Sequence, residues 1–240
     1  MALVLPLAFG LVFARQLIEF RDPFVPWTED ARLLLTGTDW GRTFLVASVL
    51  GLAAIPAFRL AGAGRASGWS LATIFVLALC AFPAFTGHAN AGEGALRVVT
   101  LSADVLHVWA AGGWIGGLAG VLVLNRSAGS TLLPRLVPAF SPVAVVCVTV
   151  LVVTGALASW IHLPDLNAVL GGTYGRTLLL KLAAVAGVLG LGWANWRRHT
   201  PRLHDPSGQE ALRKGAAMEL VLAQLVLLAT ALLVRTPPVG

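Results

Sequence analysis

The sequence predicts an all-α membrane protein: a polytopic transmembrane helical bundle of about seven spans, forming a single domain over residues 1–240. The chain is 57% hydrophobic with a mean hydropathy of +0.82, and only 12% of its residues are charged. Its apolar residues gather in runs of about 20, the length that crosses roughly 30 Å of hydrocarbon. The alternating pattern of outer-membrane barrel strands is absent. Such runs must be helical, because lipid offers no partner to backbone N–H and C=O groups.

The expected spans are separated by short loops. We place them approximately at residues 2–19, 42–61, 69–87, 98–124, 138–160, 177–196 and 215–234. The first run lacks a basic leading segment and a small-residue cleavage site, so we interpret it as a span rather than a signal peptide. The loop over residues 20–41 is rich in Pro and Trp. It is expected to hold a short amphipathic helix near Thr28–Leu35, with Thr28 as its N-cap.

The cationic residues between the spans predict the orientation. Three loops on one side of the membrane carry Arg59 and Arg65, Arg126 and Arg135, and Arg197, Arg198, Arg202, Arg213 and Lys214. Loops rich in Arg and Lys stay in the cytoplasm, which makes the N-terminus cytoplasmic and the C-terminus external. Topology therefore accounts for the formal net charge of +6, and no nucleic-acid partner is expected.

The stretch from Asp104 to Leu118 places ionisable residues inside the fourth span. At about 100° per residue, Asp104, His107, Ala111, Trp114 and Leu118 share one helix face. On nearly the opposite face lies a glycine stripe of Gly112, Gly116 and Gly120, which predicts close helix packing. The helix therefore offers a functional face to one side and a packing face to the other.

Histidines on the external side are the candidate metal ligands, because imidazole suits copper, zinc, iron and nickel. His107 is the first candidate, since ionisable groups at such depth are costly and mark functional sites. Asp104, one turn away, could accept its second ring N–H, with Trp114 beside them. His88 closes the third span on the adjacent helix, and His162 is a weaker candidate. The alternative is that these histidines are structural; whether His88 and His107 share one metal ion stays open.

Two further interior residues could form a polar pathway. Lys181 lies in the sixth span and Cys147 in the fifth. Both cysteines, Cys80 and Cys147, fall inside spans, so a disulfide is not expected. The alternative for Cys147 is a small hydrophobic residue, which is what a buried cysteine mostly is. The sequence has no phosphate-binding glycine loop, no His-Glu-x-x-His helix and no Cys-x-x-Cys motif. These absences favour a transporter or binding protein over an enzyme.

Three passages together resemble the copper resistance protein D (CopD) family of bacterial inner-membrane proteins. They are Gly87-His88-Ala89, Leu106-His107 followed by Ala110-Ala-Gly-Gly-Trp114-Ile-Gly116-Gly117-Leu118, and Thr173-Tyr174-Gly175-Arg176 leading to Leu179-Leu-Lys181. The similarity covers most of the chain from about residue 35 onward. Its most specific part is the passage from His107 to Leu118.

The resemblance implies copper uptake or copper homeostasis in the bacterial inner membrane. His88 and His107 match histidine motifs of the family and would take the role of copper ligands. A periplasmic copper chaperone of the CopC type is the implied protein partner, and it would be a separate protein. The alternative from another class is a membrane redox or assembly protein that binds haem b, because two histidines on neighbouring helices can ligate haem axially.

Overall fold

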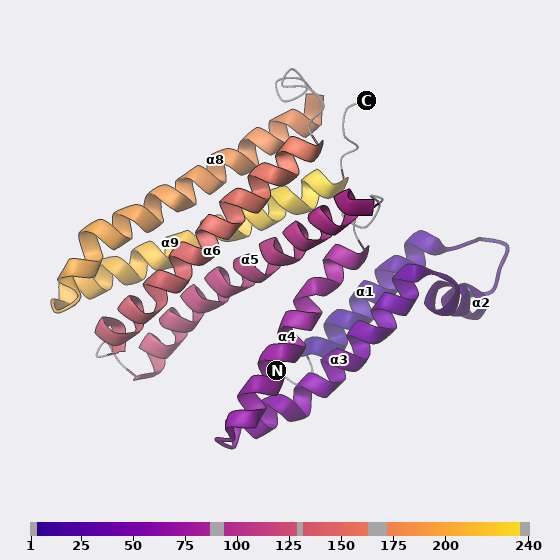
Figure 1. The fold of residues 1–240 in the computed structure, drawn as a ribbon, viewed down its shortest axis with the longest axis horizontal. Coiled ribbons are helices and arrows are strands. Elements are labelled where there is room, and N and C mark those ends of the chain that lie inside the picture. Colours follow the sequence, from indigo (N-terminus) through magenta and orange to yellow (C-terminus); the bar gives the residue numbers. More distant parts are fainter. Residues whose placement is uncertain (1–3, 87–93, 129–131, 163–171, 236–240) are drawn as a thin grey trace. The chain divides into compact units, whose positions relative to one another are not determined.

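The computed structural model describes residues 4–86, 94–128, 132–162 and 172–235 (Figure 1). Within these ranges the chain is helical and has no strand, which confirms the predicted fold class. Six helices are long and apolar enough to cross a membrane. The helix in the place of the first predicted span has 17 described residues, one turn or so less than a typical span.

The helices follow the predicted spans in order. They are α1 (Val4–Phe20), α3 (Asp39–Gly62), α4 (Ala66–Thr86), α5 (Gly94–Ala128), α6 (Leu133–His162), α8 (Gly172–Ala194) and α9 (Pro206–Arg235). Most are longer than the apolar runs that predict them, because the backbone stays helical where the chain leaves hydrocarbon. Their contacts divide the chain into two compact units, Met1–Trp109 and Ala110–Gly240.

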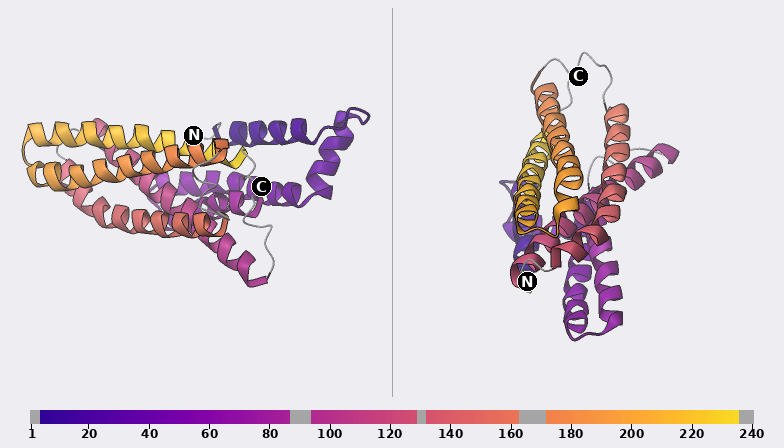
Figure 2. Two further views of the ribbon diagram at one scale, coloured as in Figure 1. Left: turned by 90° about the horizontal axis from the view of Figure 1, so that it is seen from above. Right: turned by 90° about the vertical axis from the view of Figure 1, so that its left-hand side faces the viewer.

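The first unit is built on the antiparallel hairpin of α3 and α4, which the views of Figures 1 and 2 show side by side. Small residues let the two backbones approach closely. This is common between membrane helices, because the hydrophobic effect does not drive helices together in lipid and close packing must hold them. Ala54, Ala57 and Ala84 are almost completely buried. Gly68 at the tight end of the hairpin is the extreme case, because a Cβ there would lie 2.2 Å from the backbone N of Ala61.

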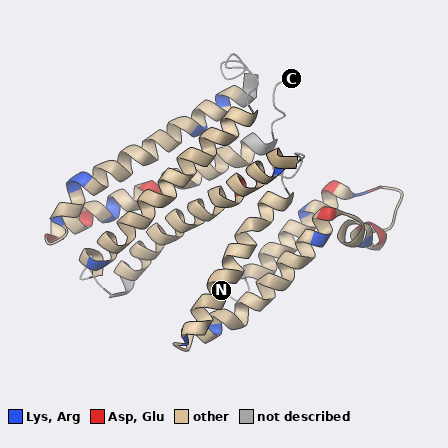
Figure 3. Cartoon of the chain, in the orientation of Figure 1, with Lys and Arg blue, Asp and Glu red and all other residues tan. Residues whose placement is uncertain are grey.

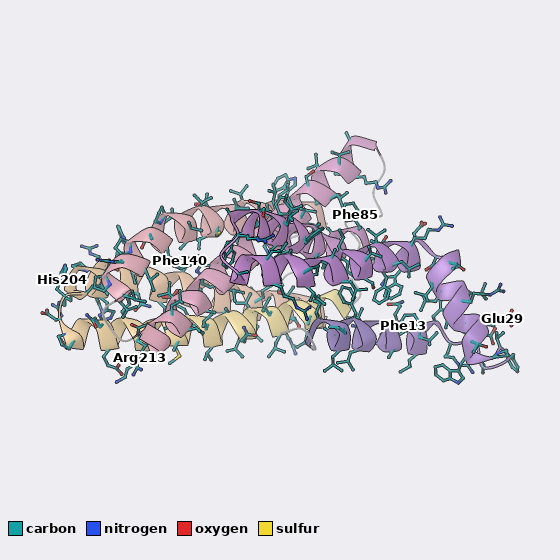
Figure 4. All side chains as sticks on the ribbon, turned by 90° about the horizontal axis from the view of Figure 1, so that it is seen from below. Phe13, Glu29, Phe85, Phe140, His204 and Arg213 are labelled. Carbon is teal, nitrogen blue, oxygen red and sulfur yellow. The ribbon has the colours of Figure 1, made fainter. Side chains whose placement is uncertain are left out.

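Aromatic rings join α1 to this hairpin. The centroid of the Phe44 ring, on α3, lies 5.7 Å from that of Phe9, 5.8 Å from that of Phe13 and 4.9 Å from that of Trp40. Gly51 lies under the Phe9 ring, where a Cβ would come within 2.8 Å of it. These contacts hold α1 on α3, with the labelled Phe13 visible between the ribbons in Figure 4.

The 20–41 loop contains the expected short helix, as α2 (Trp27–Arg32) followed by the π-helical turn η1 (Leu33–Gly37). The prediction that Thr28 caps this helix is wrong. The N-cap is Pro26, whose fixed φ of −61° and extended ψ of 144° lead the chain into the first turn without a side-chain hydrogen bond. The residue that does act as a cap is Thr38, whose Oγ1 accepts the N–H of Gly41 at 2.9 Å at the start of α3.

A buried ion pair fixes the same loop. Asp30 is 2% exposed, and its Oδ2 accepts a hydrogen bond from Arg21 Nη1 at 2.5 Å and one from the Asp22 N–H at 3.3 Å. The Arg21 guanidinium also lies 4.4 Å from the centroid of the Trp27 ring. The pair therefore fastens the start of the loop to α2.

The second unit contains α6, the hairpin of α8 and α9, and the part of α5 from Ala110 onward. The turn of the hairpin consists of the π-helical η4 (Asn195–His199) and the 3₁₀-helical η5 (Thr200–Arg202). Val121, Leu133, Leu203 and Leu212 form a buried apolar cluster that joins α5, α6, the turn and α9. Figure 3 shows that most charged residues of the described helices lie near helix ends, which leaves long uncharged stretches between them.

Candidate functional site

The predicted functional face lies on α5. Asp104 and His107 are both half-buried, one helical turn apart, within a candidate membrane span that runs from Gly94 to Asn125. Trp109 fixes this part of the helix, because its Nε1 donates a hydrogen bond to the Leu77 carbonyl of α4 at 2.8 Å. The neighbouring helix therefore sets the position of the backbone two residues beyond His107.

The other two predicted histidine ligands cannot be placed beside His107. His88 lies outside the described residues, and His162 is the last residue of α6, with its side chain outside the described part. Among the side chains that the structure describes, no three His, Cys, Asp or Glu residues gather closely enough to hold a metal ion. A site shared by His88, His107 and His162 therefore stays a prediction.

Farther along α5, Trp114 is half-buried and Leu118 is buried, on the predicted functional face. Close approach of another helix occurs at two glycines next to the predicted stripe. A Cβ on Gly117 would lie 2.2 Å from the Phe140 ring of α6, and one on Gly113 would lie 3.2 Å from the Cys147 sulfur.

The glycine stripe of Gly112, Gly116 and Gly120 has open space, with no described atom within 4 Å of an added Cβ. Its packing role stays a prediction. Cys80 and Cys147, one in each unit, are free thiols in the described structure. Cys147 and Lys181 are each half-buried in their spans. A polar pathway that includes them stays a prediction.

Sequence reasoning missed one interior carboxyl group. Glu219 lies in α9, inside the predicted span 215–234, and is 6% exposed. Its Oε1 accepts a hydrogen bond from Nδ2 of Asn195, a buried residue that begins η4 directly after α8. Glycine makes room for this pair, since a Cβ on Gly215 would lie 2.0 Å from the Asn195 Oδ1. An acidic residue within an apolar run was the available signal.

These features define a multi-pass helical membrane protein with ionisable side chains inside its spans. A sequence profile of the family described as Copper resistance protein D matches residues 134–233. The chain is 33% identical over 215 residues to copper resistance protein D of Pseudomonas syringae pv. tomato, covering 82% of this chain and 68% of that protein. The chain belongs to the copper resistance protein D family.

A second relative is the copper transport protein CutJ of Bacillus subtilis (strain 168). It is 32% identical over 148 residues, which are 60% of this chain and 27% of CutJ. The matched part of this chain therefore spans about a quarter of the length of CutJ. No solved structure matches the chain.

Proposed function

We propose that this chain binds copper in the bacterial inner membrane and takes part in copper uptake or homeostasis, with His107 as a ligand at its external side. Membership of the copper resistance protein D family and the name of the copper transport relative support copper as the cargo. The observation that carries the site is the pair Asp104 and His107, half-buried one turn apart inside an apolar helix.

The chemistry of this pair suits the proposal. An imidazole within a span costs free energy that an apolar residue would not, so its presence indicates a function. The imidazole of histidine is a suitable ligand for copper. A metal-bound histidine gives its other ring N–H to an acceptor, and Asp104 is a carboxylate within one turn of His107. His88 and, more weakly, His162 would complete the ligand set.

The orientation and the partner belong to the same proposal. With the cationic loops in the cytoplasm, the N-terminus is cytoplasmic, the C-terminus is external and His107 lies in the external half of its span. A periplasmic chaperone of the CopC type would deliver copper to that side. Lys181 and Cys147 are the candidates for polar positions along the route inward.

The direct test is the copper content of the purified full chain with His107→Ala. We expect this variant to lose most of the bound copper, whereas the control His199→Ala, in the turn between α8 and α9, keeps it. Asp104→Asn should retain the ligand but lower the copper affinity by about 10–100-fold, the usual effect of removing a ligand's orienting partner. Equal copper content in the two histidine variants would contradict the assignment of His107.

An absorption spectrum of the same preparation tests the haem alternative. Protein from haem-replete cells should show no Soret band. A Soret band that is lost in His107→Ala would replace copper with haem b as the group held there.

A further inference from the structure

The turn between α8 and α9 forms a cationic pocket that the proposed copper function does not use. Its lining consists of Arg197, Arg198, His199, Pro201 and Arg202, named here the basic pocket, around a volume of about 530 Å³. Three arginines and one histidine thus line one hollow, and the lining contains no Asp or Glu. Guanidinium groups match phosphate oxygens in both charge and geometry.

The backbone changes its helical form along the residues that line the basic pocket. An ordinary α-helix would send Arg197 and Arg198 in directions about 100° apart around its axis. Here the chain widens into a π-helical turn over Asn195–His199 and then tightens into a 3₁₀ turn over Thr200–Arg202. The buried bond of Asn195 to Glu219 holds the start of the wide turn on α9. The pocket is therefore a built part of the hairpin.

No described ion pair involves an arginine of the basic pocket. The described ion pairs of this hairpin join Glu210 to Arg213 at 2.7 Å and to Lys214 at 3.5 Å. None of the described ion pairs includes Arg197, Arg198 or Arg202. All three arginines are exposed and therefore open to a partner from outside the chain. An anion from outside the chain is the fitting partner for such a cluster.

Two tryptophans indicate which anion. Trp193 and Trp196 are 55% and 61% exposed. Trp196 directly precedes Arg197, and Trp193 lies four residues before it. The Arg197 guanidinium lies 5.2 Å from the centroid of the Trp193 ring. Indole rings settle at the boundary between hydrocarbon and headgroups, which places the basic pocket at headgroup level. We propose that the basic pocket binds the phosphate of an anionic phospholipid headgroup.

The test counts lipid on the full chain by native mass spectrometry, with phosphatidylglycerol and phosphatidylcholine as probes. We expect the unmodified protein to retain phosphatidylglycerol preferentially, and this preference should decline as salt is added, because screening weakens exposed charge pairs. The double variant Arg197→Gln with Arg198→Gln should lower the apparent affinity for phosphatidylglycerol roughly 25-fold, because each interfacial cation contributes about fivefold. The helical content of each variant is checked by circular dichroism.

The matched control is Arg213→Gln with Lys214→Gln. It removes the same two charges from the same hairpin, but from cations that Glu210 already pairs. We expect this control to keep its phosphatidylglycerol. Equal losses in the two double variants, or no preference over phosphatidylcholine in the unmodified protein, would overturn the proposal. Displacement of the lipid by inorganic phosphate alone would assign the pocket to a soluble phosphate instead. None of these readouts depends on copper.

Discussion

Replacing Asp30 with alanine tests how the loop between α1 and α3 is held. The carboxylate is 2% exposed and accepts hydrogen bonds from Arg21 and from the Asp22 N–H. Its loss leaves the Arg21 guanidinium, which is 22% exposed, without a counter-charge. Breaking a buried ion pair from one side costs about 3–5 kcal/mol in general.

The structure places the expected cost for Asp30→Ala near the lower end, at about 3 kcal/mol. Arg21 would still donate to the Val25 carbonyl, and its guanidinium would still lie over the Trp27 ring. Partial access to water adds to this compensation. Arg21→Ala should be at least as costly, because Asp30 would then keep only the Asp22 N–H. The double variant should cost less than the sum, since neither charge is left alone.

The assay is unfolding in mixed detergent micelles, followed by circular dichroism, together with amide hydrogen exchange over residues 20–38. The exchange measurement detects the case in which the loop opens without the rest of the unit. Asp39→Ala is the control, because Asp39 pairs with Arg42 at 3.6 Å while its side chain is 96% exposed. That exposed pair should contribute almost nothing. Equal effects of Asp30→Ala and Asp39→Ala would refute the reasoning.

Three further substitutions address the helix contacts. Gly215→Ala should destabilise the α8–α9 hairpin by about 1–2 kcal/mol, because a methyl group would displace the buried Asn195 amide from its bond to a carboxyl group. Glu219→Leu should cost about 1–3 kcal/mol by leaving the same amide without its acceptor. Trp109→Phe removes the donor to the Leu77 carbonyl and should cost about 0.6 kcal/mol, the average for such bonds between membrane helices. Unfolding in mixed micelles measures all three.

Two control substitutions test whether the clash at Asn195 and the lost hydrogen-bond acceptor, rather than any change in the hairpin, account for the loss of stability. Gly190→Ala lies in the same hairpin, where a Cβ meets no described atom, so it should be neutral or stabilising. Glu219→Gln retains an oxygen that can accept from Asn195 and should cost less than the leucine variant. If Gly190→Ala is as harmful as Gly215→Ala, the clash at Asn195 does not explain the loss.

The helices could be predicted because each apolar run is long and each backbone must satisfy itself in lipid. The beginning of α2 could not, because Thr28 is a good cap by composition while the conformation of Pro26 decides where the first turn starts. The pairing of Arg21 with Asp30 was also missed. It joins residues nine positions apart through a loop, and hydropathy patterns carry no information on such pairs.

The candidate site shows the same division. Helical periodicity correctly places Asp104 and His107 on one half-buried face of α5, because both lie within a single uninterrupted helix. Glu219 could be located in a span but not paired, since its partner Asn195 belongs to another helix. The sequence could not show which of the neighbouring glycines of α5 contacts another helix. Only the position of the Phe140 ring on α6 shows that Gly117 is the glycine at the close contact.

The distribution of buried polar groups decides how a loss of copper can be interpreted. The strongly buried ionisable side chains of the described chain are Asp30 and Glu219, and each accepts a hydrogen bond that orders its own unit. His107 is only half-buried, and the bond that positions its helix comes from Trp109. Because its side chain is half-buried and alanine is a strong helix former, His107→Ala should leave the helical content intact, whereas Glu219→Leu weakens the hairpin. Copper lost from a fully helical His107→Ala protein would consequently report a missing ligand rather than a damaged fold.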